Sequence, residues 1–175
     1  MSEPLDEKNA QPEGSRGEAG EGSPSDAAAE AARGKLPLGE FLEKMKEKPE
    51  EIESLGAAFY DEKRLAEALT LFRGLVEMDA RNGRYRSALG AILVAQGKHE
   101  EAIEHLDQAI AADPKNVEAL ANRAEARTAL GKFEEAHRDI QAAVELDPRK
   151  ESPAANRARK LAWGMGKLAR AAEKQ

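Results

Sequence analysis

The chain has 175 residues and a formal net charge of −6, with no cysteine, one tryptophan, two tyrosines and four phenylalanines. The lack of cysteine excludes disulfides and thiolate metal sites, and the net acidity argues against nucleic acid, because phosphate binding needs a coherent basic face. The longest purely apolar run, Ala91 to Ala95, is far shorter than the roughly 20 residues of a membrane helix. Because the first residues also lack the pattern of a secretory signal, we expect a cytoplasmic protein without a transmembrane segment.

The N-terminal part of the chain divides into two segments. Residues 1–34 carry eight acidic and three basic side chains with almost no large apolar residue, which predicts a disordered acidic tail. Residues 35–48 place apolar side chains at the i, i+3, i+4 and i+7 positions of one helix face: Leu38, Phe41, Leu42 and Met45. This amphipathic helix is expected either to pack as an N-terminal cap on the first repeat or to form the contact of a homodimer.

Residues 49–150 repeat with a period of 34 residues. The letters GKHEEA, which begin at Gly97, return as GKFEEA at Gly131, and a degenerate copy, KRLAEA, begins at Lys63. A second series with the same spacing centres on Asp79, Asp113 and Asp147. The period divides this part of the chain into three repeats, at 49–82, 83–116 and 117–150.

Small residues recur where two helices of one repeat are expected to approach closely: Gly56, Gly90 and Ala124, and then Ala68, Ala102 and Ala136. Gly97 and Gly131 fall between the two helices, where a positive φ costs little without a Cβ. Proline cannot continue a helix, so Pro114 and Pro148 are expected beyond the ends of the second helices. Three residues are expected as wedges at the start of those helices: Leu65, His99 and Phe133.

Residues 151–175 predict a basic C-terminal capping helix. An apolar face is formed by Ala158, Leu161, Ala162, Met165, Leu168 and Ala172. This face is expected to cover the end of the third repeat, as a stack of repeats requires for solubility. Trp163 lies away from that face. It either returns to the protein through a kink at Gly164 and Gly166 or serves as an anchor for a partner.

A 34-residue period of two helices resembles the tetratricopeptide repeat (TPR). The resemblance implies an all-α solenoid of three helix–turn–helix repeats, with a helix before it and a capping helix after it. It also implies a concave groove lined by the first helix of each repeat, which binds a peptide or helix of another protein. The groove positions of the TPR fold correspond here to Glu53, Ala57, Tyr60, Arg84, Ser87, Ala91, Val94, Ala121, Glu125 and Thr128.

The lining of this groove is small and mixed, with acidic ends. TPR domains that grip a chaperone's C-terminal carboxylate use lysine and asparagine side chains, whereas the corresponding positions here include Glu53, Ala57 and Glu118. A carboxylate ligand would be repelled. We therefore expect an extended or helical peptide with apolar anchors and some basic character.

A narrower resemblance is to the class II type III secretion chaperones, the LcrH/SycD group. It is carried by the stretch from Leu71 to Lys98, with Asp79, Arg84 and Tyr85, and by Ala124-Glu125. This resemblance implies a cytoplasmic chaperone that holds a secreted translocator in the groove. Because Glu53 stands where that group typically has an aromatic ring, a general adaptor or scaffold is the first hypothesis and the secretion chaperone the alternative.

Motifs of catalysis, metal binding and cofactor binding are missing from the sequence. There is no HExxH, GxSxG, P-loop or dinucleotide glycine pattern. The three histidines are His99, expected as a partly buried wedge, and His105 and His137, expected on the surface. We therefore expect a protein that is not an enzyme and has no cofactor or metal. A third hypothesis, attachment to a membrane surface, would use the basic C-terminal helix and Trp163.

Overall fold

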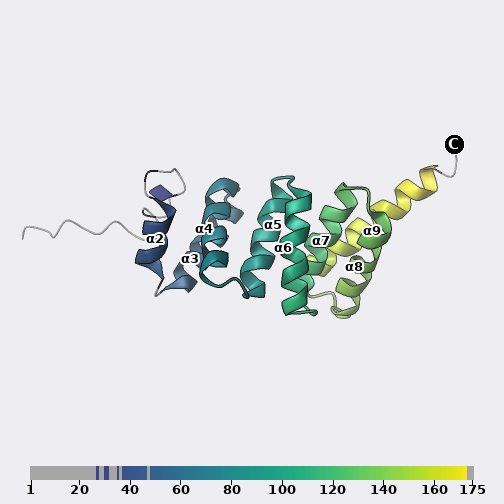
Figure 1. Cartoon of the computed structure of the whole chain (residues 1–175). Helices are drawn as coiled ribbons and strands as arrows, with labels where there is room; N and C mark the ends of the chain where they lie inside the picture. The colour runs from purple at the N-terminus through teal and green to yellow at the C-terminus, as the bar shows by residue number, and fades with distance from the viewer. Residues whose placement is uncertain (1–26, 28–29, 32–34, 36, 47, 173–175) are drawn as a thin grey trace, which may run out of the picture.

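The computed structural model describes residues 27, 30–31, 35, 37–46 and 48–172, and its regular elements there are all helices. Figure 1 shows them in a row, with α2 at one end and α9 at the other. Their bounds are α2 Leu38–Met45, α3 Pro49–Asp61, α4 Leu65–Met78, α5 Gly83–Ala95, α6 His99–Ala112, α7 Val117–Ala129, α8 Phe133–Glu145 and α9 Pro153–Ala172. The predicted all-α solenoid is confirmed.

The helices pack as three pairs. The pairs are α3 with α4, α5 with α6, and α7 with α8, and neighbouring pairs meet through α4 with α5 and α6 with α7. The first helices α5 and α7 also touch each other, while α9 packs on α7 and α8. The domain boundaries expected from the sequence, at residues 34, 48 and 150, stay predictions.

Asparagine side chains begin the first helices of the second and third pairs. The Asn82 Oδ1 atom accepts a hydrogen bond from the backbone N–H of Arg84 at 3.1 Å. The Asn116 Oδ1 atom accepts one from the N–H of Ala119 at 2.8 Å. Each cap satisfies a backbone donor that the helix itself leaves unpaired, which typically contributes about 1 kcal/mol.

The turn inside each pair requires a left-handed backbone. Gly97 has φ +76° and Gly131 has φ +73°, as expected from their places in the repeat. The first turn has Lys63 in the corresponding position, with φ +63°. A left-handed backbone costs a residue with a Cβ about 1 kcal/mol or more. The first repeat therefore keeps the geometry of the turn without the glycine that favours it.

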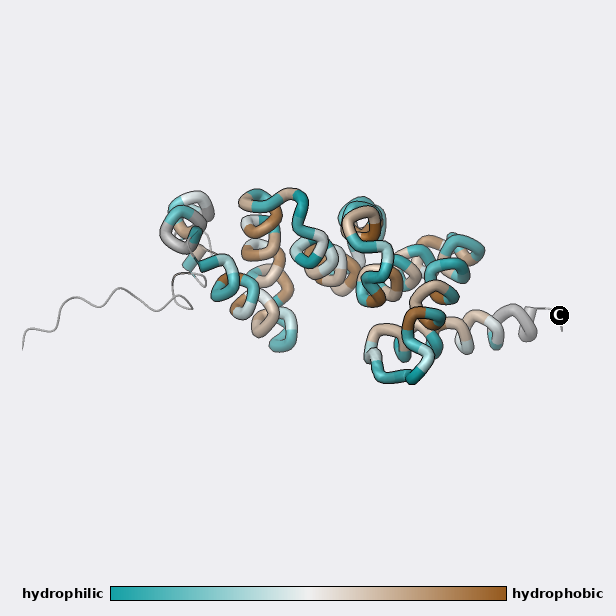
Figure 2. The backbone as a smooth tube through the Cα atoms, turned by 90° about the horizontal axis from the view of Figure 1, so that it is seen from below, coloured by the Kyte–Doolittle hydropathy of each residue, from teal (hydrophilic) through white to brown (hydrophobic). Residues whose placement is uncertain are grey.

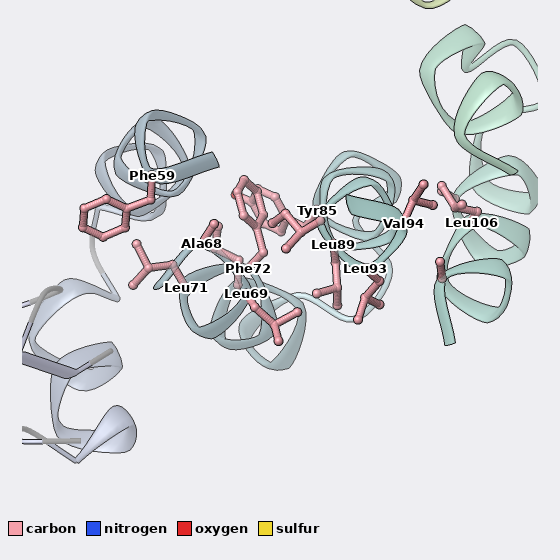
Figure 3. Close-up of a cluster of buried hydrophobic side chains, with 14 of the residues drawn as sticks. Phe59, Ala68, Leu69, Leu71, Phe72, Tyr85, Leu89, Leu93, Val94 and Leu106 are labelled. Atoms are coloured by element: carbon pink, nitrogen blue, oxygen red, sulfur yellow. The ribbon is translucent and has the colours of Figure 1, made fainter. Parts of the chain in front are cut away.

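The main hydrophobic core runs between the helices of the first two pairs and reaches α2 and α7. Figure 3 shows part of this cluster, including Leu71, Phe72 and Leu106. Burying one such side chain fully contributes roughly 1.5–3 kcal/mol. Along the chain, hydrophobic residues recur on the helices, whereas the connections between them are mostly hydrophilic (Figure 2).

Phe41 of α2 is fully buried in the main core, and α2 contacts α3 and α4. This packing is that of a cap on the first pair. The side chains of Leu38, Leu42 and Met45 lie outside the described residues. Ala27, Glu30 and Ala31 are helical, and Ala31 is buried in the same core. The other residues of the disordered tail expected for residues 1–34 lie outside the described residues, so that expectation stays a prediction.

A second hydrophobic cluster joins α7, α8 and α9. Ala154 and Ala158 are buried in it, and Leu161, Ala162 and Met165 pack against it. The early part of α9 therefore covers the third pair as expected, while its C-terminal part extends beyond the rest (Figures 1 and 2). The side chains of Leu168 and Ala172 lie outside the described residues.

A buried ionic network holds α6, α7 and α8 together around Asp139, whose side chain is 5% exposed. Arg123 donates to both carboxylate oxygens of Asp139, at 2.7 and 3.0 Å, and to Asp107 at 2.6 Å. Arg127 donates to Asp139 at 2.7 Å. Burial lowers the pKa of Arg123, but the hydrogen bonds to the two carboxylates outweigh it and raise that pKa above its usual value.

Candidate functional site

A cavity of about 420 Å³ opens beside the first helices of the three pairs. Its lining comes from α3, α5, α7 and α9, with Phe72 from α4 and Asn116 from the turn before α7. Six of the ten groove residues expected from the sequence line it together: Glu53, Ala57, Tyr60, Arg84, Ser87 and Ala91. The repeat period therefore brought these side chains from two different helices to one cavity.

The wall of the cavity is small and apolar. Ala57 and Ala91 face it with a single methyl group each, and behind them Phe72 and Ile92 belong to the buried core. Tyr60, which is half-buried, adds an aromatic ring, and the Lys63 Nζ atom lies 5.6 Å from the centre of that ring. Small side chains next to buried core residues leave room for a ligand's apolar side chains.

Glu53 and Arg84 pair across α3 and α5 at the cavity. The Arg84 Nη2 atom donates to the Glu53 Oε1 atom at 2.5 Å. This hydrogen bond, followed by the attraction of the two charges, raises the pKa of Arg84 above its usual value. The carboxylate of Glu53 therefore has a positive charge beside it at the cavity, which the sequence alone did not indicate.

The cavity is bounded at another side by Arg157, a residue of the capping helix. Its Nη2 atom donates to the Oδ1 atom of buried Asn122 at 3.0 Å. The sequence predicts neither residue at the groove, because it assigns the C-terminal helix to the end of the third repeat and not to the groove. Glu118 also lines the cavity, and no ion pair joins it to Arg157 in the described part of the chain.

The other four expected groove residues lie elsewhere. Ala121 and Glu125 line a neighbouring hollow of about 370 Å³ together with Arg157 and Lys160. Val94 is buried in the main core, because α5 packs against α4, α6 and α7 at once (Figure 3). Thr128 is partly covered by α9, and its hydroxyl donates to the Ala124 carbonyl at 2.8 Å and lies 3.7 Å from the Met165 sulfur.

Trp163 is 68% exposed on α9. The helix continues without interruption from Pro153 to Ala172, so the kink considered at Gly164 and Gly166 does not return the indole to the protein. The Lys167 Nζ atom lies 5.5 Å from the ring centre. The indole therefore stays largely exposed, and its role as an anchor for a partner stays a prediction.

Other chemical features of the described residues are few. They contain no group of three or more histidine, aspartate or glutamate side chains that could hold a metal ion. His105 is partly buried, and burial together with the nearby charge of Arg86 lowers its pKa below 6.5. Nor does any helix in this part of the chain have the length and apolar character needed to cross a membrane.

Comparison with known proteins gives a consistent picture. A family model described as a tetratricopeptide repeat matches residues 59–108 and 93–162. The TPR repeat-containing thioredoxin TTL4 of Arabidopsis thaliana is 34% identical over 70 residues, which span 40% of this chain and 10% of that protein. The chain thus corresponds to about a tenth of the length of this curated relative.

Solved structures share the fold. The second TPR domain of human RPAP3, in complex with the HSP70 peptide SGPTIEEVD, is 28% identical, with a TM-score of 0.55 over 62% of this chain and 90% of that one. The translocator chaperone SycD of Yersinia enterocolitica is 22% identical, with a TM-score of 0.62 over 74% of this chain and 96% of that one.

Proposed function

Because the chain belongs to the tetratricopeptide repeat family, we propose that it is a non-catalytic adaptor or scaffold that binds a peptide or helix of a partner protein in the cavity beside α3, α5 and α7. The observation that carries this proposal is the cavity itself, with small Ala57 and Ala91 next to Tyr60 and above a buried floor. The human RPAP3 domain, whose structure was solved with a peptide, supports the use of this fold for peptide binding.

The charges of the cavity favour a ligand with apolar anchors and some basic character. Glu53 is already paired with Arg84, whereas Glu118 of the cavity and Glu125 of the neighbouring hollow make no ion pair among the described residues. A basic side chain of the ligand could pair with these carboxylates, which both belong to α7. An acidic C-terminus would meet these two carboxylates as like charges, so we expect a ligand of the EEVD kind to bind poorly.

The secretion-chaperone alternative has weaker support. At 22% identity, the likeness to SycD is evidence of the common fold and not of a common ligand. The lining includes two aromatic rings, Tyr60 and the buried Phe72, beside several small and polar side chains, and this mixture suits a general adaptor better than an aromatic groove does. We also propose a cytoplasmic location. The homodimer contact through α2 stays a prediction.

Selection from a library of random peptides tests the proposal. Peptides enriched by the wild-type chain should bind poorly to Ala91→Glu, which places a charge in the cavity, and to Tyr60→Ala, which removes its aromatic ring. Gln108→Glu, at an exposed position on α6, is the matched control and should bind as the wild type does. Peptides that bind all four proteins equally would place the ligand site outside the cavity and contradict the proposal.

A further inference from the structure

The exposed side of α9 forms a continuous basic and aromatic surface, made of Arg157, Lys160, Trp163 and Lys167. All four side chains are exposed, and α9 has no acidic residue between Pro153 and Ala172. At 100° per residue they lie within an arc of roughly 120°, opposite the face that packs on α7 and α8, and they extend over about 15 Å of helix. We call this surface the α9 stripe.

The cations of the α9 stripe have no carboxylate partner among the described residues. Within the described residues, Lys160 makes no ion pair, Lys167 contacts only the Trp163 ring, and Arg157 donates only to the neutral amide of Asn122. Arg159, on the edge of the helix that faces α8, differs because it pairs with Asp147 at 2.9 Å. Three uncompensated positive charges therefore surround an exposed indole, in a chain whose net charge is −6.

We propose that the α9 stripe binds an acidic segment of a partner protein. Carboxylates of that segment pair with Arg157, Lys160 and Lys167, and an apolar side chain packs on the Trp163 ring. Tryptophan and arginine are the residues that most often dominate the energy of protein interfaces, and complementary charge fixes orientation and speeds association. This surface adjoins the cavity of the proposed function at Arg157 and continues from there along α9 to Lys167. Its preference for acidic groups is the opposite of that of the carboxylates Glu118 and Glu125.

The position of α9 favours a separate partner over the chain's own acidic N-terminal segment. Ala27, the first described residue, packs against the main core, which reaches α2. The helices α2 and α9 lie at opposite ends of the row (Figure 1). The acidic segment that precedes Ala27 is therefore attached at the end of the solenoid that is remote from the α9 stripe.

A membrane surface is also a poor match. A helix that lies in a lipid interface buries a whole apolar face among the acyl chains. The apolar face of α9, with Leu161, Ala162 and Met165, instead packs against the second hydrophobic cluster. Trp163 is the single large apolar side chain of the α9 stripe, and one indole among three cations suits a peptide with alternating acidic and apolar groups.

The test uses the full chain and a fluorescein-labelled synthetic peptide in which glutamates flank one phenylalanine, with both ends capped so that no terminal carboxylate takes part. Anisotropy measures binding, and the emission of Trp163, the one tryptophan of the chain, reports where the peptide lies. We expect saturable binding that shifts this emission and weakens with added salt. The double variant Lys160→Glu/Lys167→Glu should lose about tenfold or more in affinity.

Matched controls separate this surface from general charge effects and from the cavity. Arg81→Glu/Lys98→Glu changes the net charge by the same amount at exposed positions of the first two pairs, and should bind the peptide as the wild type does. Ala91→Glu should also leave this binding unchanged, so failure of the cavity and failure of the α9 stripe can be told apart. Circular dichroism verifies that each variant is folded.

Several results would overturn the inference. They are an absence of binding to the wild type, equal affinity for the double variant, equal binding of a peptide with lysine in place of glutamate, and unchanged Trp163 emission. Binding of the chain to phosphatidylserine vesicles in place of the peptide would identify a membrane surface. A gain in peptide affinity on neutralising the seven carboxylates of residues 1–26 would show that the chain's own segment occupies the α9 stripe.

Discussion

Gly90 of α5 packs tightly against Leu106 of α6, and Gly90→Ala perturbs this contact with a single methyl group. A Cβ at this position would lie 2.5 Å from the Leu106 Cγ atom and 2.7 Å from its Cδ2 atom. Leu106 is fully buried, and Cγ is the branch point of its side chain, so a rotation of the terminal methyl groups cannot relieve the contact. The helices must separate or Leu106 must leave its rotamer.

Two opposing effects set the size of the change in stability. Alanine is the better helix former by about 1 kcal/mol, whereas overpacking a filled core costs typically 1–3 kcal/mol. A contact as short as 2.5 Å belongs at the upper end of that range. We therefore expect Gly90→Ala to lower the free energy of unfolding by about 1–2 kcal/mol. Gly164→Ala in α9 is the matched control, because a Cβ there meets nothing within 4 Å, and should raise it by up to about 1 kcal/mol.

Urea unfolding followed by far-UV circular dichroism measures both effects. The midpoint should move down for Gly90→Ala and up for Gly164→Ala, with little change in the slope of the transition. If Gly90→Ala is as stable as the wild type, the two helices are not packed as closely as described. The explanation of why a small residue recurs at this position would then be wrong.

Three further predictions concern stability. Asp139→Ala leaves Arg123 and Arg127 without their shared buried carboxylate, and should lower the free energy of unfolding by about 3 kcal/mol in the same urea assay; a loss below about 1 kcal/mol would contradict the network. Asn116→Ala removes the cap of α7 and should cost about 1 kcal/mol, whereas an unchanged midpoint would mean that the cap is dispensable. The pKa of His105 is lowered in the folded state, mainly by burial, so the unfolded chain binds more protons and stability should fall as the pH drops through 6.5; His105→Gln should flatten this part of the pH profile, and an unchanged profile would show that His105 is not its source.

The helices and their pairing could be predicted because their causes are local and recur. Gly97 and Gly131 supply the left-handed turns, and Asn116 supplies a cap, at fixed places in a 34-residue period. The same period indicates which residues of the first helices share one side, and for this reason Ala57 and Ala91 could be expected to lie together, as they do in the lining of the cavity.

The rest of the site depends on how separate elements meet, which the period does not specify. Arg157 reaches the cavity because α9 crosses α7, where its guanidinium donates to Asn122, and the same crossing partly covers Thr128. Phe133, expected as a wedge, is 53% exposed. Phe133 begins α8, the second helix of the last pair, and no further pair follows to pack on it. The equivalent residues Leu65 and His99 begin α4 and α6, each of which is followed by another pair, so the same position of the repeat has different surroundings.

The most direct test of the central claim is to map where a selected peptide binds. Backbone amide chemical shifts of the full chain, followed by NMR as the peptide is added, locate the contact residue by residue. The proposed function predicts that the largest changes gather at the cavity, around Ala57, Tyr60 and Ala91. Changes confined to α4, α6 and α8, with the cavity unaffected, would contradict it.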